Sequence, residues 1–187
     1  VGPSKYVAQV FSERGAYRIP HKIEQMKDGI IYLSFTRFKR IPIIAIIKAL
    51  GLQKDSEIME TISKSKVFDD VFINLYHGVD IKTENDSINF LASRMGLNFP
   101  KEILKEKVYE NLDKYLLPHL GITKESRMNK AHNICKMIKK FLIISQKNIV
   151  IDKDHYMNKR LKLSGDLLMD LFRVNMRALV NDLLYNF

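Results

Sequence analysis

The sequence predicts a mainly α protein of the α+β class, with a small β element at its N-terminus. Two observations support this fold class. Strand-like composition and turn signals are confined to residues 1–40, whereas apolar side chains recur at helical spacing from residue 41 onward. We therefore expect a single domain over residues 1–187, with a β-rich part (1–40), a helical part (41–150) and a polar loop followed by a final helix (151–187).

The β-rich part contains a predicted hairpin. Residues 30–35 are rich in strand-forming side chains and follow the turn signal Lys27-Asp28-Gly29. An Asp-Gly pair next to such a run is typical of a tight hairpin turn, so residues 22–35 are expected to form a hairpin. Strand-like composition around Val7 and Phe11 indicates a further short strand before it.

Capping signals predict short helices in the middle of the chain. Pro42 suits a first helical position, and Gly51 suits the position that follows the last turn of the same helix. Ser56 and Asp86 are the predicted N-caps of the second and the fourth helix. The expected bounds of these later helices are 57–63 for the second, 69–76 for the third and an end at Gly96 for the fourth.

Three longer helices follow. The first has Leu104 to Tyr115 at helical spacing and is expected to end before Pro118. The next has an apolar stripe from Met128 to Leu142 and exposes three lysines on its other side, Lys136, Lys139 and Lys140. The last helix, over residues 167–187, is predicted to bury Leu168, Leu171, Phe172, Met176, Leu179 and Leu183.

Composition limits the classes of function. Hydrophobic residues make up 46% of the chain, which excludes intrinsic disorder, and a single Cys excludes a disulfide scaffold. No apolar run is long enough to span a membrane, and no membrane partner is predicted. The formal net charge is +10, but residues 51–100 have a net charge of −3. This uneven charge suggests a protein that meets a polyanion on one side.

No catalytic residue is predicted. The sequence contains no Gly-x-Ser-x-Gly motif, no phosphate-binding Gly-rich loop and no dinucleotide fingerprint. Cys135 lies on an apolar helical stripe, where a free Cys behaves as a small hydrophobic residue. His119 follows Pro118 at a helix end and is interpreted as a hydrogen-bonded loop residue.

Residues 152–160 (Asp-Lys-Asp-His-Tyr-Met-Asn-Lys-Arg) form a dense polar cluster with three interpretations. Asp152, Asp154 and His155 are possible ligands of a divalent cation, as in a small metal-dependent hydrolase, although no further ligand lies nearby in sequence. Alternatively, the loop contacts a polyanion through Lys159 and Arg160 while Asp154 and Asn158 read a base edge. In the structural interpretation, Asp154 caps the final helix and His155 is a hydrogen-bonded packing residue.

The cluster and the helix after it resemble the second-largest, β-like subunit of cellular multisubunit DNA-dependent RNA polymerases, in its archaeal version. The resemblance rests on residues 152–160 with Gly165-x-Leu-Leu and Leu171-Phe-Arg after them. Residues 41–51 and the segment Leu117-Pro-His-Leu agree with two further family segments, in the family's order. The matching region is the lobe domain. The chain starts at Val1 and ends within a predicted helix, so we expect a fragment of a larger chain that continues into the family's protrusion.

The resemblance implies a wall of the cleft that holds downstream DNA in a nucleotidyltransferase, without the catalytic centre. No catalytic residue, metal ligand or cofactor is expected in this chain, because the family holds its Mg²⁺ elsewhere. Residues matching Asp154 and Lys159 line a pocket for a non-template base in the bacterial branch, and Asn158 and Arg160 belong to the same loop. Lys159 replaces a bacterial Arg and Met157 replaces a small residue, which favours backbone contact over base reading.

The implied partners are the other polymerase subunits, downstream and non-template DNA, and transcription initiation and elongation factors in the cytoplasm. The acidic segment, with Asp69 and Asp70, is the predicted docking face for factors. The alternative is a stand-alone basic helical module that binds nucleic acid or protein outside any polymerase.

Overall fold

The computed structural model describes residues 4–14, 17–36, 38–62, 69–81, 83–97, 99–146, 155–159 and 161–186. The chain divides into two compact units, residues 1–148 and residues 149–187. Each unit is described by itself. The α+β fold class with a dominant helical part is confirmed.

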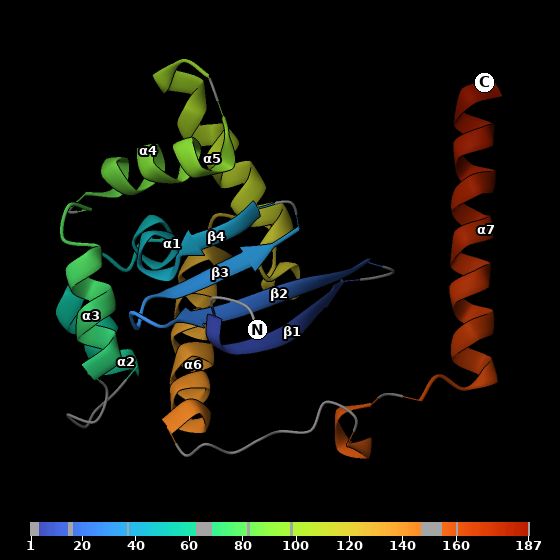
Figure 1. The fold of residues 1–187 in the computed structure, drawn as a ribbon. Helices are drawn as coiled ribbons and strands as arrows, with labels where there is room; N and C mark the ends of the chain where they lie inside the picture. Colours follow the sequence, from blue (N-terminus) through green and yellow to red (C-terminus); the bar gives the residue numbers. More distant parts are fainter. Residues whose placement is uncertain are drawn as a thin grey trace. The chain divides into compact units, whose positions relative to one another are not determined.

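The first unit contains an antiparallel sheet of β1 (Ser4–Arg14), β2 (Tyr17–Met26), β3 (Ile31–Phe35) and β4 (Phe38–Pro42), in that order (Figure 1). The predicted hairpin is confirmed, since Ile23 pairs with Leu33 and the Met26 N–H donates to the Ile30 carbonyl at 2.9 Å. Gly29 supplies the turn with a backbone φ of +86°, which a side chain would disfavour.

Helix α1 (Ile43–Ala49) is the centre of the hydrophobic core, and each of its side chains is buried. It packs against α3, α4, α6 and the sheet. Pro42 is the N-cap and not the first helical residue, a shift of one position. Lys48 is the charged residue of this helix, and its ammonium group donates to the Ile81 carbonyl at 2.9 Å and pairs with Asp55 at 3.0 Å. These contacts compensate the buried charge.

Two predicted caps are wrong. Helix α2 (Asp55–Ile62) begins before Ser56, because Asp55 already lies in its first turn. Helix α4 (Glu84–Met95) is capped by Thr83, whose hydroxyl accepts the Asp86 N–H at 3.2 Å. Asp86 is the third helical residue and accepts the Thr83 N–H in return, which completes a capping box. The predicted end at Gly96 is confirmed, with Gly96 in the left-handed region.

The remaining helices of the first unit are α3 (Asp69–His77), α5 (Lys101–Tyr115) and α6 (Ser126–Gln146), with a short 3-10 turn at Pro118–Leu120. Helix α5 ends before Pro118, as predicted. His119 is hydrogen-bonded, as predicted, because its Nδ1 lies 2.7 Å from the Ser12 hydroxyl. Buried His21 on β2 accepts the Leu117 N–H at 3.1 Å. These two histidines connect the sheet to the segment between α5 and α6.

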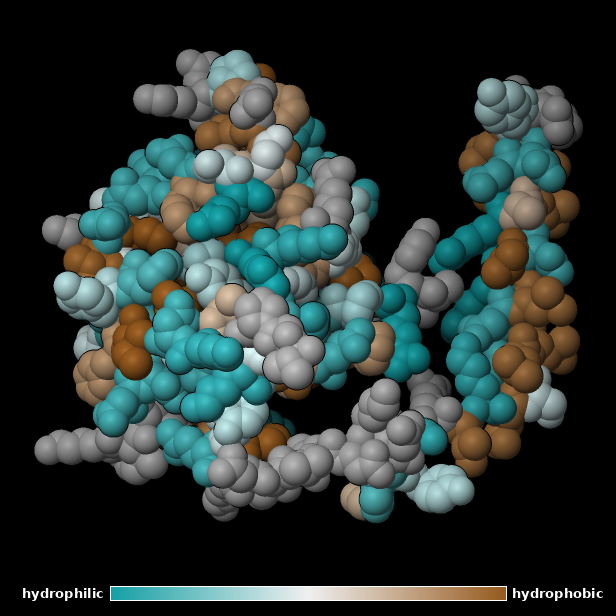
Figure 2. Space-filling view, in the orientation of Figure 1, coloured by the Kyte–Doolittle hydropathy of each residue, from teal (hydrophilic) through white to brown (hydrophobic). Residues whose placement is uncertain are grey.

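The second unit contains a 3-10 turn (Tyr156–Asn158) and α7 (Ser164–Asn186). The predicted burial of the α7 apolar stripe is not provided within the second unit. Leu168, Phe172 and Leu183 are 68%, 63% and 49% exposed. Figure 2 shows apolar side chains along one side of this helix. The reason is that no described residue of the second unit covers them.

Candidate nucleic-acid interface

The structure describes two of the four residues predicted to contact nucleic acid. Asn158 ends the 3-10 turn Tyr156–Asn158, and Lys159 follows it with an exposed side chain. Asp154 and Arg160 lie outside the described residues. The turn is held locally, since His155 Nδ1 accepts the Met157 N–H at 3.2 Å. Asn158 and Lys159 are thus adjacent in a short turn, and the loop as a base-reading site stays a prediction.

The structural interpretation of the same loop is wrong in two details. Helix α7 begins at Ser164, and the carboxylate at its N-terminus is Asp166, which accepts the Leu163 N–H at 3.2 Å. Asp154 precedes this helix by too many residues to cap it. His155 is exposed and hydrogen-bonded within the turn, so it is not a packing residue in the described part of its unit.

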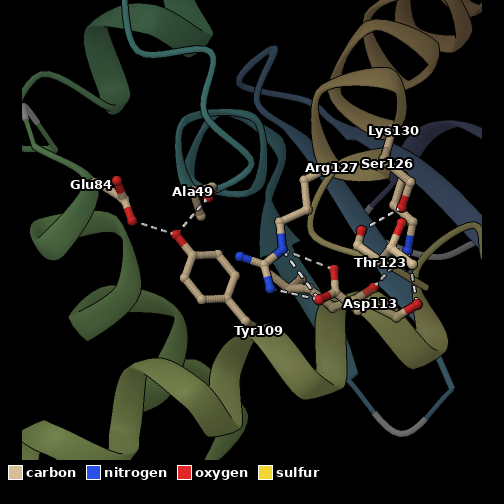
Figure 3. Close-up of polar contacts among 9 residues, drawn as sticks. Ala49, Glu84, Tyr109, Asp113, Thr123, Ser126, Arg127 and Lys130 are labelled. Atoms are coloured by element: carbon tan, nitrogen blue, oxygen red, sulfur yellow. Dashed lines mark hydrogen bonds and ion pairs between the residues drawn. The ribbon is translucent and has the colours of Figure 1, made fainter. Parts of the chain in front are cut away.

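Helix α6 carries a concentration of basic residues that the loop-centred prediction passed over. Between Ser126 and Gln146 the sequence has five Lys or Arg residues and no Asp or Glu. The first two, Arg127 and Lys130, are used within the fold (Figure 3). The Arg127 guanidinium donates three hydrogen bonds of 2.6–3.1 Å to the Asp113 carboxylate on α5. A two-pronged contact of this kind fixes geometry as well as charge.

Lys130 is completely buried, and its ammonium group donates to the carbonyl of Asp113 at 2.8 Å and to that of Leu112 at 3.3 Å. Burial lowers the pKa of Lys130 to about 8. The two carbonyl groups at the C-terminal end of α5 offset part of the desolvation of this charge. Arg127 and Lys130 therefore fix the first half of α6 against α5.

The polar contacts continue from Arg127 to α4. The guanidinium lies 3.8 Å from the centre of the Tyr109 ring, and the Tyr109 hydroxyl is 2.6 Å from the Glu84 carboxylate (Figure 3). Lys105 pairs with the same carboxylate at 2.9 Å. These hydrogen bonds, that from Tyr109 above all, lower the pKa of Glu84. The network orients α4, α5 and α6 relative to one another, and Lys105 is its exposed end.

The second half of α6 has a different character. Within the described parts of the chain, no ion pair involves Lys136, Lys139 or Lys140. Lys136 and Lys140 are exposed. Lys136 lies three residues after Asn133 and Lys140 four residues after Lys136, so the three side chains share one face. Buried Ile134 and Ile138 lie on the other face. This face offers cations and amide donors without a nearby carboxylate on the same helix, the chemistry that contacts phosphate.

Several other lysines and arginines of the first unit are already paired. Lys22 and Arg40 flank Glu24, Lys54 pairs with Glu57, and Lys107 pairs with Glu110. The number of basic residues in a segment therefore overstates the unpaired positive charge that a ligand meets. The sequence does contain a signal for α6, namely a long helical run without any acidic residue.

The predicted docking residues Asp69 and Asp70 form the first turn of α3. The Asp69 side chain is exposed and that of Asp70 is half-buried. Acidic groups at this position are favoured by the helix dipole. Their location on the surface of an acidic segment is compatible with docking, which stays a prediction.

The described residues offer no arrangement typical of catalysis. No group of three His, Cys, Asp or Glu side chains among them has metal-binding geometry. Two of the three predicted metal ligands, Asp152 and Asp154, lie outside that part of the chain. Cys135 is buried, as predicted, and burial raises its pKa to about 12, so it is not a nucleophile. No described helix combines the length and the apolarity needed to cross a bilayer.

Comparison with known proteins decides the family. The family described as RNA polymerase Rpb2, domain 2, matches residues 4–162. The chain belongs to this family. The resemblance stated from the motifs is therefore confirmed. The match covers the first unit and the polar loop, and it stops just before α7 begins.

Similar proteins come from archaea. The chain is 37% identical over 183 residues to the DNA-directed RNA polymerase subunit Rpo2 of Saccharolobus solfataricus. The aligned region covers 96% of this chain and 16% of that protein. It is 34% identical to Rpo2N of Halobacterium salinarum and 36% identical to Rpo2N of Methanococcus vannielii. These matches cover 98% and 96% of this chain, and 36% and 37% of the two relatives. The chain thus spans well under half the length of these curated relatives.

Proposed function

We propose that this chain is the lobe region of the second-largest subunit of an archaeal DNA-directed RNA polymerase and serves RNA synthesis from a DNA template. The observation that carries the proposal is the match to Rpb2 domain 2 over residues 4–162, together with 34–37% identity to archaeal polymerase subunits. The assembled enzyme is a nucleotidyltransferase. Its Mg²⁺ and its catalytic centre would lie in other parts of the enzyme, and the partners of this chain would be the other subunits.

Within that enzyme we assign the chain to a wall of the downstream DNA cleft. Lys136, Lys139 and Lys140 of α6 support this role, because among the described residues none of them takes part in an ion pair. Contacts of this kind recognise the phosphate backbone and carry no sequence information. We expect the same face to tolerate any DNA sequence and to release it as the salt concentration rises.

The loop of Asp154, Asn158, Lys159 and Arg160 is proposed to meet the non-template strand near the edge of the bubble. Lys159 is exposed and follows a short turn that is hydrogen-bonded within itself. This position supports a contact between Lys159 and a DNA strand. A Lys is a point charge without the planar fork of Arg, so we expect a phosphate contact in preference to base reading.

A second role is docking of initiation or elongation factors on the acidic segment, through Asp69 and Asp70. Their position in the first turn of α3, on the surface, supports this role. Reversing both charges is expected to weaken recruitment of a factor and to leave factor-independent elongation unchanged. The cytoplasm is the proposed location, since archaeal cells carry out transcription there.

The first experiment measures the size of the native protein and tests whether it co-elutes with RNA polymerase activity. An antibody raised against this chain is used on extract of the source cell, fractionated by size and assayed for DNA-dependent RNA synthesis. We expect a band well above 21.8 kDa that co-elutes with the activity. A band at 21.8 kDa away from the activity would refute the proposal and would favour the stand-alone binding module.

A further inference from the structure

Helix α3 is apolar on two faces, and within the described part of the chain one of them is covered and the other is exposed. Val71 and Leu75 are buried against the core. On the other side Phe72, Ile73 and Tyr76 are 56%, 42% and 81% exposed. In Figure 2, apolar side chains reach the surface at the left of the molecule, where α2 and α3 lie. A surface helix normally has a polar outer face, so the outer face of α3 is unlike that of a solvated helix.

The spacing of these residues makes the exposed surface continuous. Phe72 and Tyr76 are four residues apart and Ile73 and Tyr76 are three residues apart, which makes each pair neighbours on the surface of the helix. Val79 follows in the turn after α3 and is 48% exposed. We name the surface formed by Phe72, Ile73, Tyr76 and Val79 the α3 outer face. Aromatic anchors of this type are enriched in the centres of protein interfaces and not on free surfaces.

The α3 outer face stands on a rigid support. Buried Asn74 accepts the Ile31 N–H at 2.7 Å and donates to the Gly29 carbonyl at 3.0 Å. It also lies 2.6 Å from the Asp70 carbonyl of its own helix. One side chain thus fixes α3 to the hairpin between β2 and β3. A face that is held in place loses little freedom on binding, which favours affinity.

The charge beside this face selects the partner. Asp69 and Asp70 precede it, Asp80 follows it, and the described residues 69–81 contain no Lys or Arg. Duplex DNA and an anionic membrane would both meet like charge here. A second copy of the chain would bring the same carboxylates together. A protein surface with an apolar pocket bordered by Lys or Arg would bury the aromatic side chains and pair with the carboxylates.

We propose that the α3 outer face is the anchor by which this domain docks a protein whose apolar pocket is bordered by Lys or Arg residues. The proposal rests on the factor-docking role given above and specifies it. Asp69 and Asp70 then steer the partner, whereas Phe72 and Tyr76 provide most of the affinity. The acidic pair alone, as first predicted from the sequence, would give only a weak and salt-sensitive contact.

The test uses the assembled polymerase that contains this chain. The probes are the purified archaeal initiation and elongation factors, added one at a time, and the readout is the equilibrium affinity for each. Phe72→Ala with Tyr76→Ala is expected to weaken the binding of at least one factor about 30-fold, the loss typical of interface anchors. The control, Phe99→Ala with Ile122→Ala, removes side chains that are 47% and 48% exposed elsewhere and should change no affinity.

A second pair of variants separates charge from apolar contact. Asp69→Lys with Asp70→Lys is expected to slow association and to weaken its dependence on salt, while Phe72→Ala with Tyr76→Ala mainly speeds dissociation. Factor-independent RNA synthesis should stay unchanged in both, which also verifies that the enzyme is assembled.

Three results would overturn the inference. These are unchanged affinity for every factor, an equal loss in the Phe99 and Ile122 control, and self-association of the chain that disappears with Tyr76→Ala, which would make the occupant a second copy. Each of these leaves the polymerase assignment intact, because that assignment is tested by co-elution with the activity.

Discussion

The three lysines of α6 that make no ion pair within the described part of the chain give the sharpest test of the cleft-wall role. We replace Lys136, Lys139 and Lys140 together by Ala in the 187-residue chain and measure binding to a short DNA duplex of mixed sequence. Lys136 and Lys140 are exposed and Lys139 is partly exposed, so the core should be unaffected. Lys136 and Lys140 are about 6 Å apart along the helix axis, which allows each to reach its own phosphate.

The expected magnitude follows from counterion release. Each lysine that neutralises a phosphate of duplex DNA adds about 0.9 to the negative slope of log affinity against log salt. Three lysines add about 2.7 to that slope. Between about 50 and 200 mM salt, the wild-type chain should lose about 40-fold more affinity than the variant.

The assay is fluorescence anisotropy of the labelled duplex across a salt series. The control variant replaces Lys54, Lys107 and Lys162 by Ala, which removes the same amount of charge from lysines that are ion-paired with Glu57, Glu110 and Asp170. We expect the slope of this control to stay near that of the wild type. Equal slopes for the two triple variants would refute the reasoning, since only total charge would then matter.

Three further predictions concern stability and transcription. Burial lowers the pKa of His21, so below pH 6.5 the unfolded chain binds a proton that the folded chain does not. The free energy of unfolding should therefore fall as the pH drops below 6.5. In His21→Gln, the free energy of unfolding measured in urea should depend less on pH. Asp113→Ala removes the ion-pair partner of the nearly buried Arg127 guanidinium. In urea unfolding, this variant should lower the free energy of unfolding by about 3 kcal/mol. A change below about 0.5 kcal/mol would contradict a structural role of the pair. Lys159→Ala in the assembled enzyme should alter pausing or start-site choice with near-normal single-nucleotide addition, and loss of addition would mean a different role.

Local signals located many elements of the fold. The Asp28-Gly29 turn and the left-handed Gly96 were predicted because both depend on the backbone freedom of one residue. The cap of α4 was misassigned because Thr83 and Asp86 are both good capping residues, and their reciprocal hydrogen bonds decide which one precedes the helix. In a capping box, the residue types identify the two residues that are paired, but they do not show which of them is the N-cap and which is the third helical residue.

The candidate site was less accessible to sequence reasoning. The loop with Asn158 and Lys159 was singled out by motif, whereas the lysines of α6 were treated as an ordinary solvated face. Ion pairing made the difference, because Arg127 on α6 pairs with Asp113 on α5, whereas Lys136 pairs with no carboxylate of the described residues. The order of charged residues along the sequence does not show ion pairs between residues on different helices or strands.

By itself the sequence determined the fold class, the family and the polar loop, because these depend on periodicity, turn chemistry and a long motif. Tertiary structure decided which charges remain available and which apolar side chains remain uncovered. Lys130 and Lys136 belong to the same helix, yet one is buried against carbonyl groups and the other faces solvent. Likewise, Leu75 is buried and Tyr76 next to it is 81% exposed. The physical reason is that burial and pairing are set by neighbours from distant parts of the chain, which only folding brings together.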